Sequence, residues 1–310
     1  MRNSYTSTIP SHTRSAVRFN QVAVQIPVWC IVVAVLFSGT THAQSRGPEA
    51  GSLLLAGGGI RDAAIFERFI ALAGGDQAVL VVIPTAGGAQ AYDQDCSCAD
   101  PFRKLGVKDV TVLHTYDPTE ADSDLFIRPI SRATGVWFSG GRQWRLMDAY
   151  AGTKALGAFR GVLTRGGAIG GSSAGATIQG SYLARGDSRT NTIMMGDHEA
   201  GFGFLSGVAV DQHVLKRNRP FDMLEIVEAH PDLLGIGLDE DTAIVVHGTS
   251  FEVIGNSYVL IYDSKNSLGS DAPFYFLTAG DTFDLVSRLP IGDDVRGLQN
   301  RLQRSNETRQ

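Results

Sequence analysis

The sequence predicts an α/β fold, in which helices cover both faces of a mostly parallel sheet and further strands follow towards the C-terminus. Short apolar runs that end in glycine alternate with longer amphipathic stretches through the first half of the chain. The runs are apolar at nearly every position, which is typical of strands that are buried on both sides. Such strands in alternation with helices indicate a parallel sheet that helices cover on both faces.

The elements of the first half are expected in the following order. SLLLAGGG (52–59) is a strand with its loop, and IFERFIALAG (65–74) is a helix because Ile65, Phe69 and Leu72 share one helical face. Further strands are expected in AVLVVIPTAGG (78–88), VTVLHTY (110–116) and GVWFSGG (135–141), and a helix in RQWRLMDAYAGT (142–153). The glycine-rich stretch GGAIGGSSAGATIQG (166–180) comes next, and TIQGSYLA (177–184) is expected to be helical.

The second half is richer in strands, some of them in hairpins. They are expected in GVAVDQH (207–213), GIGLDEDTAIVVHG (235–248), SFEVIGN (250–256) and YVLIYD (258–263). PFDMLEIVEAH (220–230) is one clear helix, with Pro220 suited to its first turn. In open α/β sheets, ligands bind beyond the carboxyl ends of the strands. The loops 57–59, 85–88, 139–141 and 171–175 are therefore expected to converge on a site.

The N-terminus predicts export. Arg2, Arg14 and Arg18 lie in an acid-free lead, and the apolar run IPVWCIVVAVLFSG and then THAQ follow, as in a secretory signal peptide with cleavage after Ala43. The apolar run is shorter than the roughly 20 residues of a membrane span, so no stable span is expected after cleavage. An uncleaved anchor is the alternative. The expected organisation is a signal peptide at 1–43, a single α/β domain at 44–292 and a polar tail at 293–310, in a periplasmic or extracellular protein.

Charge and cysteine content exclude several classes of function. Loss of residues 1–43 removes three of the 27 basic residues and leaves 24 against 32 acidic residues, a net charge of −8, which argues against nucleic acid as a partner. Cys30 leaves with the signal peptide. Cys96 and Cys98 are too few for a disulfide framework, and no histidine cluster lies near them to complete a metal site. They are two loop thiols or a local disulfide, and no metal or cofactor is expected.

The glycine-rich stretch contains a candidate nucleophile. Residues 171–175 (GSSAG) match G-x-S-x-G with Ser173 at the centre, where a tight strand-to-helix turn exposes the serine. The N–H of Ala174 is then a natural donor to an oxyanion, and the loop with Gly141 can supply a second donor. A glycine-rich turn that packs a helix on a strand or binds phosphate is the alternative, but neither G-x-x-x-x-G-K-[ST] nor a convincing G-x-G-x-x-G is present.

A nucleophilic serine needs a base that a third group orients. After signal cleavage the chain offers His114, His198, His213, His230 and His247. His213 is favoured, because it ends the strand-like GVAVDQH on the expected side of the sheet and KRNR follows closely.

Six motifs follow one another along the chain: LLLAGGG, IPTA, FSGGRQ, GGSSAGA, then VDQH with two arginines close behind, and GIGLDEDTA. Taken together and in this order, they resemble serine peptidase family S51, and most of all its cyanophycinase-like branch, over about residues 52–263. The resemblance implies a class I glutamine-amidotransferase-like (flavodoxin-like) fold and a Ser–His–acid site. With the predicted signal peptide, the leading hypothesis is a secreted serine exo- or isopeptidase that works through an acyl-enzyme. The resemblance implies hydrolysis at aspartyl residues, in aspartyl dipeptides or in the β-linked Asp–Arg units of cyanophycin.

The resemblance also implies roles for single residues. Ser173 is the nucleophile, His213 the base, and the backbone of Gly141 and Ala174 the oxyanion hole. The implied substrate-contacting residues are Gln143, Asp211, Gln212, Arg217 and Arg219. The third catalytic position is an acid shortly after the helix of the nucleophile, where Asp187 in ARGDSRTN is the only acid. Glu240 and Asp241 are the fallback.

Several questions stay open at the level of sequence. Asp222 stands near a position where some cyanophycinases carry a further arginine, so the choice between cyanophycin and aspartyl dipeptides is not made. One alternative is an α/β-hydrolase esterase with Ser173, Asp239 and His247, which would need an antiparallel opening hairpin. Another is a catalytically dead homologue that binds the same peptide or cyanophycin-like ligand. A homodimer is also left open.

Overall fold

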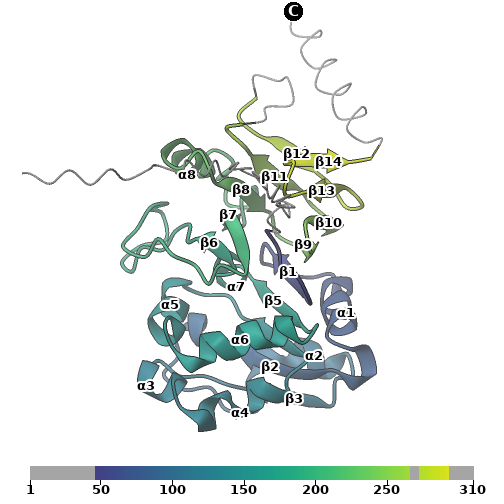
Figure 1. The fold of residues 1–310 in the computed structure, drawn as a ribbon, viewed down its shortest axis with the longest axis vertical. Helices are drawn as coiled ribbons and strands as arrows, with labels where there is room; N and C mark the ends of the chain where they lie inside the picture. The colour runs from purple at the N-terminus through teal and green to yellow at the C-terminus, as the bar shows by residue number, and fades with distance from the viewer. Residues whose placement is uncertain (1–45, 266–271, 293–310) are drawn as a thin grey trace, which may run out of the picture. The chain divides into compact units, whose positions relative to one another are not determined.

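The computed structural model describes residues 46–265 and 272–292 (Figure 1). The predicted signal peptide at 1–43 and the polar tail at 293–310 lie outside the described residues. Within the described ranges, no helix has the length and apolar character needed to cross a bilayer.

The larger sheet runs in the order β14-β13-β10-β9-β1-β5-β4-β2-β3. Its parallel half consists of β1 (Ser52–Ala56), β5 (Ala168–Ser172), β4 (Gly135–Phe138), β2 (Val79–Ile83) and β3 (Asp109–Val112). The antiparallel half adds β9 (Thr242–His247), β10 (Ser250–Gly255), β13 (Thr282–Asp284) and β14 (Leu289–Ile291). The predicted parallel strands and the additional C-terminal strands are confirmed.

Helices cover both faces of the parallel half (Figure 1). Successive side chains of a strand point to opposite faces, and the two cores follow this alternation. Leu53 and Leu55 belong to one core and Leu54 to the other. The first core includes α4 (Asp124–Arg132), α5 (Trp144–Tyr150) and α6 (Lys154–Thr164). The second core includes α1 (Ala63–Leu72) and α2 (Asp100–Lys104).

The smaller sheet runs in the order β12-β11-β8-β7-β6. It consists of β12 (Tyr275–Leu277), β11 (Val259–Tyr262), β8 (Leu234–Leu238), β7 (Leu205–Gln212) and β6 (Gly180–Tyr182). Helix α8 (Met223–Ala229) packs on this sheet through Met223 and Ile226. The segment 239–241 joins β8 of the smaller sheet to β9 of the larger one, and so runs between the two sheets.

Two local predictions are wrong. TIQGSYLA is not a helix, because α7 (Ala174–Thr177) stops after about one turn and β6 begins at Gly180. Here the pairing of β6 with β7 prevails over the helical pattern. Pro220 precedes α8, whose N-cap is Asp222, and its carbonyl instead accepts a hydrogen bond from the Tyr262 hydroxyl.

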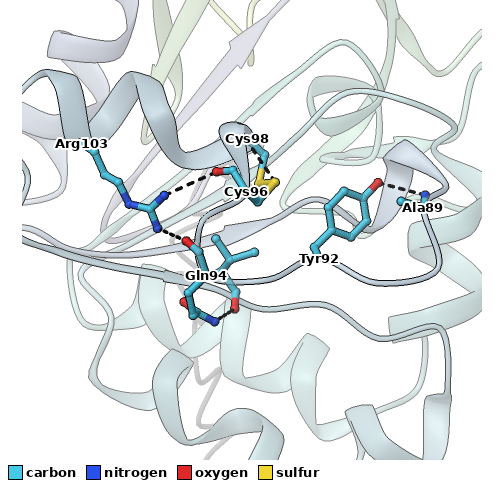
Figure 2. Close-up of a disulfide and its surroundings, with 7 residues drawn as sticks. Ala89, Tyr92, Gln94, Cys96, Cys98 and Arg103 are labelled. Carbon is cyan, nitrogen blue, oxygen red and sulfur yellow. Dashed lines mark hydrogen bonds between the residues drawn. A yellow bond between two sulfur atoms is a disulfide. The ribbon is translucent and has the colours of Figure 1, made fainter.

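The loop between β2 and β3 contains the two cysteines, which a disulfide joins (Figure 2). The Gln94 amide extends the pairing of the edge strand β3, since it accepts from the Val112 N–H and donates to the Val112 carbonyl. Arg103 donates to the carbonyls of Gln94 and Cys96. The short elements here and nearby are η1 (Gly75–Gln77), η2 (Thr85–Gly87), η3 (Ser97–Ala99) and α3 (Pro118–Ala121).

Candidate active site

The loops that follow β1, β2, β4 and β5 converge, as predicted. The N–H of Ser173, after β5, donates to the carbonyl of Ala56 at the end of β1 over 2.9 Å. The N–H of Arg142, after β4, donates to the carbonyl of Ala86 over 2.8 Å. Gly140 lies so close to the candidate nucleophile that a Cβ there would stand 3.4 Å from the Ser173 Cβ. The carboxyl ends of four parallel strands therefore surround Ser173.

Ser173 occupies a strained turn between β5 and α7. Its φ of 56° and ψ of −114° lie outside the regions that a residue with a side chain normally adopts. The flanking glycines explain how the turn closes. A Cβ on Gly171 would collide with the backbone of Gly175, and one on Gly175 would collide with the Phe138 carbonyl of β4. The local sequence thus builds the tight elbow that G-x-S-x-G predicts.

Three side chains form a continuous hydrogen-bonded chain at this elbow. His213 Nε2 lies 2.9 Å from Ser173 Oγ, and His213 Nδ1 lies 2.7 Å from Glu240 Oε1. Ser173 comes from the larger sheet, His213 follows β7 of the smaller sheet, and Glu240 lies in the segment between the sheets. The arrangement is that of a nucleophile, a base and a carboxylate that orients the base.

The loop after β1 packs directly behind the imidazole. The N–H of His213 donates to the carbonyl of Gly57 over 3.1 Å. A Cβ on Gly58 would run into the His213 ring, and one on Gly59 would run into the Glu240 carboxylate. Both glycines also have positive φ, of 111° and 53°. The glycines of LLLAGGG therefore leave room for the base and its acid.

The surroundings keep His213 neutral. Burial lowers its pKa below the ordinary value of 6.5, and the nearby charges of Arg217 and Arg219 lower it further. The hydrogen bond and negative charge of Glu240 oppose this shift without cancelling it. A neutral imidazole with Nδ1–H directed at Glu240 has a free lone pair on Nε2 for the proton of Ser173.

Asp187, the acid first expected to orient His213, lies elsewhere. Its carboxylate accepts hydrogen bonds from the N–H groups of Arg189, at 3.0 Å, and Thr190, at 2.8 Å. Asp187 therefore stabilises the turn of its own loop, a common use of aspartate. The fallback residue Glu240 is the one in contact with His213.

The residues implied to contact substrate divide into two groups. Arg217 is exposed, and Arg219 is half-buried with an Nη1 atom that has no hydrogen-bond partner among the residues that the structure describes. Gln212 is nearly buried, and its Oε1 lies 3.5 Å from Ser173 Oγ. Gln212 thus lies beside the nucleophile, and the charges of Arg217 and Arg219 are close enough to the base to lower its pKa.

Gln143 and Asp211 form the second group, and they support the site from within. Gln143 is 1% exposed, and its amide donates to the carbonyls of Ala184 and Arg185. Asp211 accepts two hydrogen bonds from Arg185, at 2.8 and 3.0 Å, and Arg185 also pairs with Asp222 at 2.6 Å. Both side chains therefore bond to protein groups in this structure, and their contact with substrate stays a prediction. Sequence reasoning missed Arg185, although it stands two residues before Asp187 in the same motif.

The esterase arrangement is wrong. His247 lies beside Ser52, at the start of β1, with its Nδ1 3.2 Å from Ser52 Oγ, whereas Ser173 lies beyond the other end of β1. Asp239 accepts hydrogen bonds from the N–H groups of Leu215 and Lys216 instead. The first two strands are also parallel members of one sheet rather than a hairpin.

Two backbone N–H groups lie beside the nucleophile. Ala174 follows Ser173 directly and begins α7, and Gly141 lies in the loop that touches Ser173. Gly141 has a φ of 143°, and a Cβ there would collide with the Ala86 carbonyl, so only glycine fits. Within residues 46–265 and 272–292, neither N–H donates to a protein acceptor.

Known proteins are similar to this chain in sequence and in fold. The model of peptidase family S51 matches residues 53–254. A cyanophycinase of Synechococcus elongatus is 34% identical over 236 residues, which cover 74% of this chain and 72% of the relative. A cyanophycinase of Trichormus variabilis is 29% identical over 269 residues, or 79% and 90% of the two chains.

Solved structures agree with this likeness. A peptidase from an acI-B1 actinobacterium superposes with a TM-score of 0.61 at 25% identity, over 77% of this chain and 98% of the other. A putative peptidase E from Listeria monocytogenes has a TM-score of 0.50 at 17% identity, over 67% of this chain and 100% of the other, and shares the fold.

Proposed function

The chain belongs to peptidase family S51 and is a cyanophycinase-like serine-type peptidase, and we propose that it is exported and cleaves bonds at aspartyl residues through an acyl-enzyme on Ser173. One observation carries the proposal. Ser173, His213 and Glu240 form an unbroken hydrogen-bonded chain at a strained elbow, with distances of 2.9 and 2.7 Å.

The first half of the reaction forms the acyl-enzyme. Ser173 Oγ attacks the scissile carbonyl while its proton passes to His213 Nε2, and Glu240 stabilises the resulting imidazolium. The negative oxygen of the tetrahedral intermediate accepts hydrogen bonds from the N–H groups of Gly141 and Ala174. Loss of one such donor typically costs about 100- to 1,000-fold in rate. His213 then gives its proton to the leaving amine, and the bond between the carbonyl carbon and nitrogen breaks.

The second half releases the product. A water molecule gives a proton to His213 Nε2 and attacks the ester carbonyl, and the same N–H groups stabilise the second tetrahedral intermediate. His213 returns the proton to Ser173 Oγ as the ester bond breaks. The lowered pKa of His213 suits both steps, because the ring begins each of them as a neutral base.

Arg219 supports the choice of an aspartyl substrate. Its Nη1 is buried and has no hydrogen-bond partner within residues 46–265 and 272–292. Its charge is close enough to His213 to lower the pKa of the imidazole. A bond at aspartate leaves a carboxylate near the scissile carbonyl. A guanidinium binds a carboxylate through two parallel hydrogen bonds. Arg219, with the exposed Arg217 beside it, is therefore our candidate for the carboxylate clamp.

The proposed substrates are aspartyl dipeptides and the β-linked Asp–Arg units of cyanophycin. The curated relatives named above are cyanophycinases, which favours the polymer. Asp222 stands near a position where some cyanophycinases carry a further arginine, and its carboxylate pairs with Arg185. A substrate cation therefore has to compete with Arg185 for Asp222.

The N-terminal sequence and the disulfide both favour export. It is supported by the basic lead, the apolar run and the small residues before Gln44. The disulfide between Cys96 and Cys98 adds support, because disulfides persist mainly in oxidising compartments.

Turnover with matched serine variants tests the proposal. The protein from Gln44 onward is incubated with cyanophycin and with α- and β-aspartyl dipeptides, and the products are identified by mass. We expect wild type and Ser172→Ala to release products and Ser173→Ala to lose most activity with its fold intact. Binding of a substrate without turnover by wild type would instead favour a catalytically dead homologue. Wild-type turnover by both variants would remove Ser173 from the mechanism.

A further inference from the structure

We infer that Asp239 and Asp241, on either side of Glu240, are positioning residues with separate effects on the reaction. Asp239 holds the residues 214–219, here called the arginine turn, which carry Arg217 and Arg219. Asp241 holds the residues 57–62, here called the glycine turn, which pack behind His213 and Glu240. The inference deepens the proposed function and rests on it for the role of the two arginines.

Asp239 holds the arginine turn at its start. Its Oδ1 accepts hydrogen bonds from the N–H groups of Leu215, at 3.0 Å, and Lys216, at 2.8 Å. Its Oδ2 accepts from Ser257 Oγ at 2.7 Å. The side chain is 7% exposed, so these bonds replace water rather than compete with it.

The arginine turn has the hydrogen bonds of a single helical turn. The N–H of Arg217 donates to the His213 carbonyl over 2.9 Å, and the N–H of Asn218 donates to the Leu215 carbonyl over 2.9 Å. The first N–H groups of such a turn have no partner within it. The Asp239 carboxylate supplies that partner, so its loss would loosen the turn and with it the two guanidinium groups.

Asp241 makes a matching set of contacts with the glycine turn. Its Oδ1 accepts from the N–H groups of Arg61, at 2.7 Å, and Asp62, at 2.8 Å. Its own N–H donates to the carbonyl of Gly58 over 2.9 Å, and its Oδ2 accepts from the Asn256 amide at 3.1 Å. Burial alone would raise the pKa of Asp241, but these donors lower it, so the carboxylate is charged at neutral pH.

The two turns contact different parts of the site. The glycine turn touches the catalytic pair directly, since Gly58 lies against the His213 ring and Gly59 against the Glu240 carboxylate. The arginine turn leads away from His213 and ends with Arg217 and Arg219. Loosening the glycine turn should therefore affect proton transfer and kcat, whereas loosening the arginine turn should affect substrate binding and KM.

Paired variants test this separation. Asp239→Ala should raise KM about tenfold or more and leave kcat within about threefold, whereas Asp241→Ala should lower kcat about tenfold or more, because small misplacements of catalytic groups are costly. Asp239→Asn should restore most of the wild-type KM, since its oxygen can still accept from Leu215 and Lys216 while its NH2 donates to Ser257. Asp284→Ala is the matched control. Asp284 likewise accepts from two consecutive N–H groups and one serine hydroxyl, in a turn of the β13–β14 hairpin.

Two measurements do not depend on the substrate. A fluorophosphonate, which phosphonylates Ser173 with loss of fluoride, should label Asp241→Ala more slowly than wild type and Asp239→Ala at the wild-type rate. Hydrogen exchange read by mass spectrometry should show lost protection of residues 214–219 in Asp239→Ala only. These measurements separate a failure of this inference from a failure of the aspartyl specificity, in which wild type would react with the probe but cleave no aspartyl substrate.

The opposite results would overturn the inference. If Asp239→Ala behaved as Asp284→Ala does in KM and in exchange, Asp239 would not position the arginine turn. If Asp239→Ala and Asp241→Ala changed kcat, KM and probe labelling in the same proportions, the two acids would act as one support for the whole site rather than separately.

Discussion

Replacement of Glu240 by glutamine would test whether Glu240, rather than Asp187, is the acid that orients His213. The Glu240 carboxylate lies 2.7 Å from His213 Nδ1 and accepts its proton in a hydrogen bond. A glutamine can instead present its NH2 group to Nδ1. The imidazole would then carry its proton on Nε2, which faces Ser173 Oγ at 2.9 Å and could no longer accept the serine proton.

The size of the effect follows from this geometry. A hydrogen bond to a charged group contributes about 1.5–3 kcal/mol. Since burial already lowers the pKa of His213 below 6.5, removal of the carboxylate should lower it further. The rise of kcat/KM with pH follows the pKa of His213, so its midpoint should lie below 6.5 in wild type and lower still in Glu240→Gln. The wrong tautomer should reduce kcat about 1,000-fold or more, as for the corresponding change in other serine proteases.

The assay is the pH dependence of kcat and kcat/KM for wild type, Glu240→Gln and the control Asp187→Asn, with thermal unfolding to verify each fold. Asparagine at 187 keeps an oxygen for the N–H groups of Arg189 and Thr190, so the control should retain kcat. A larger loss of kcat in Asp187→Asn than in Glu240→Gln, with both variants folded, would refute the reasoning.

Three further predictions concern substrate binding, packing and export. At least one of Arg217→Lys and Arg219→Lys should lower kcat/KM for aspartyl substrates about tenfold, or about 1.4 kcal/mol, because lysine cannot form two parallel hydrogen bonds to a carboxylate. Equal kcat/KM values in both variants and wild type would place the carboxylate clamp elsewhere. Gly58→Ala should lose most of kcat, since the new Cβ would meet the His213 ring. Gly157→Ala is the control, at a helical position with open space around it, and should keep full activity. Comparable kcat values in the two variants would contradict the close packing of Gly58 against His213. The exported protein should begin at Gln44, as N-terminal mass analysis would show, and an intact N-terminus would instead indicate an anchor.

Several features of this protein could be predicted from local sequence because local chemistry determines them. Apolar runs that end in glycine marked the parallel strands, and these strands and their converging loops are present in the fold. The flanking glycines of Ser173 identified the elbow, since without them β5, α7 and β4 could not approach so closely. His213 could be proposed because a polar DQH abruptly ends an apolar strand.

The tertiary structure decided which distant groups meet. Nothing in the sequence around Asp187 shows that its carboxylate binds the neighbouring Arg189 and Thr190 N–H groups, or that Glu240 reaches His213 from the segment between the two sheets. The sequence likewise does not show that Arg185 binds the Asp211 carboxylate. The physical reason is that a glycine or an apolar run determines the conformation of its own segment. A carboxylate instead accepts hydrogen bonds from whichever donors the packing of distant strands brings within about 3 Å.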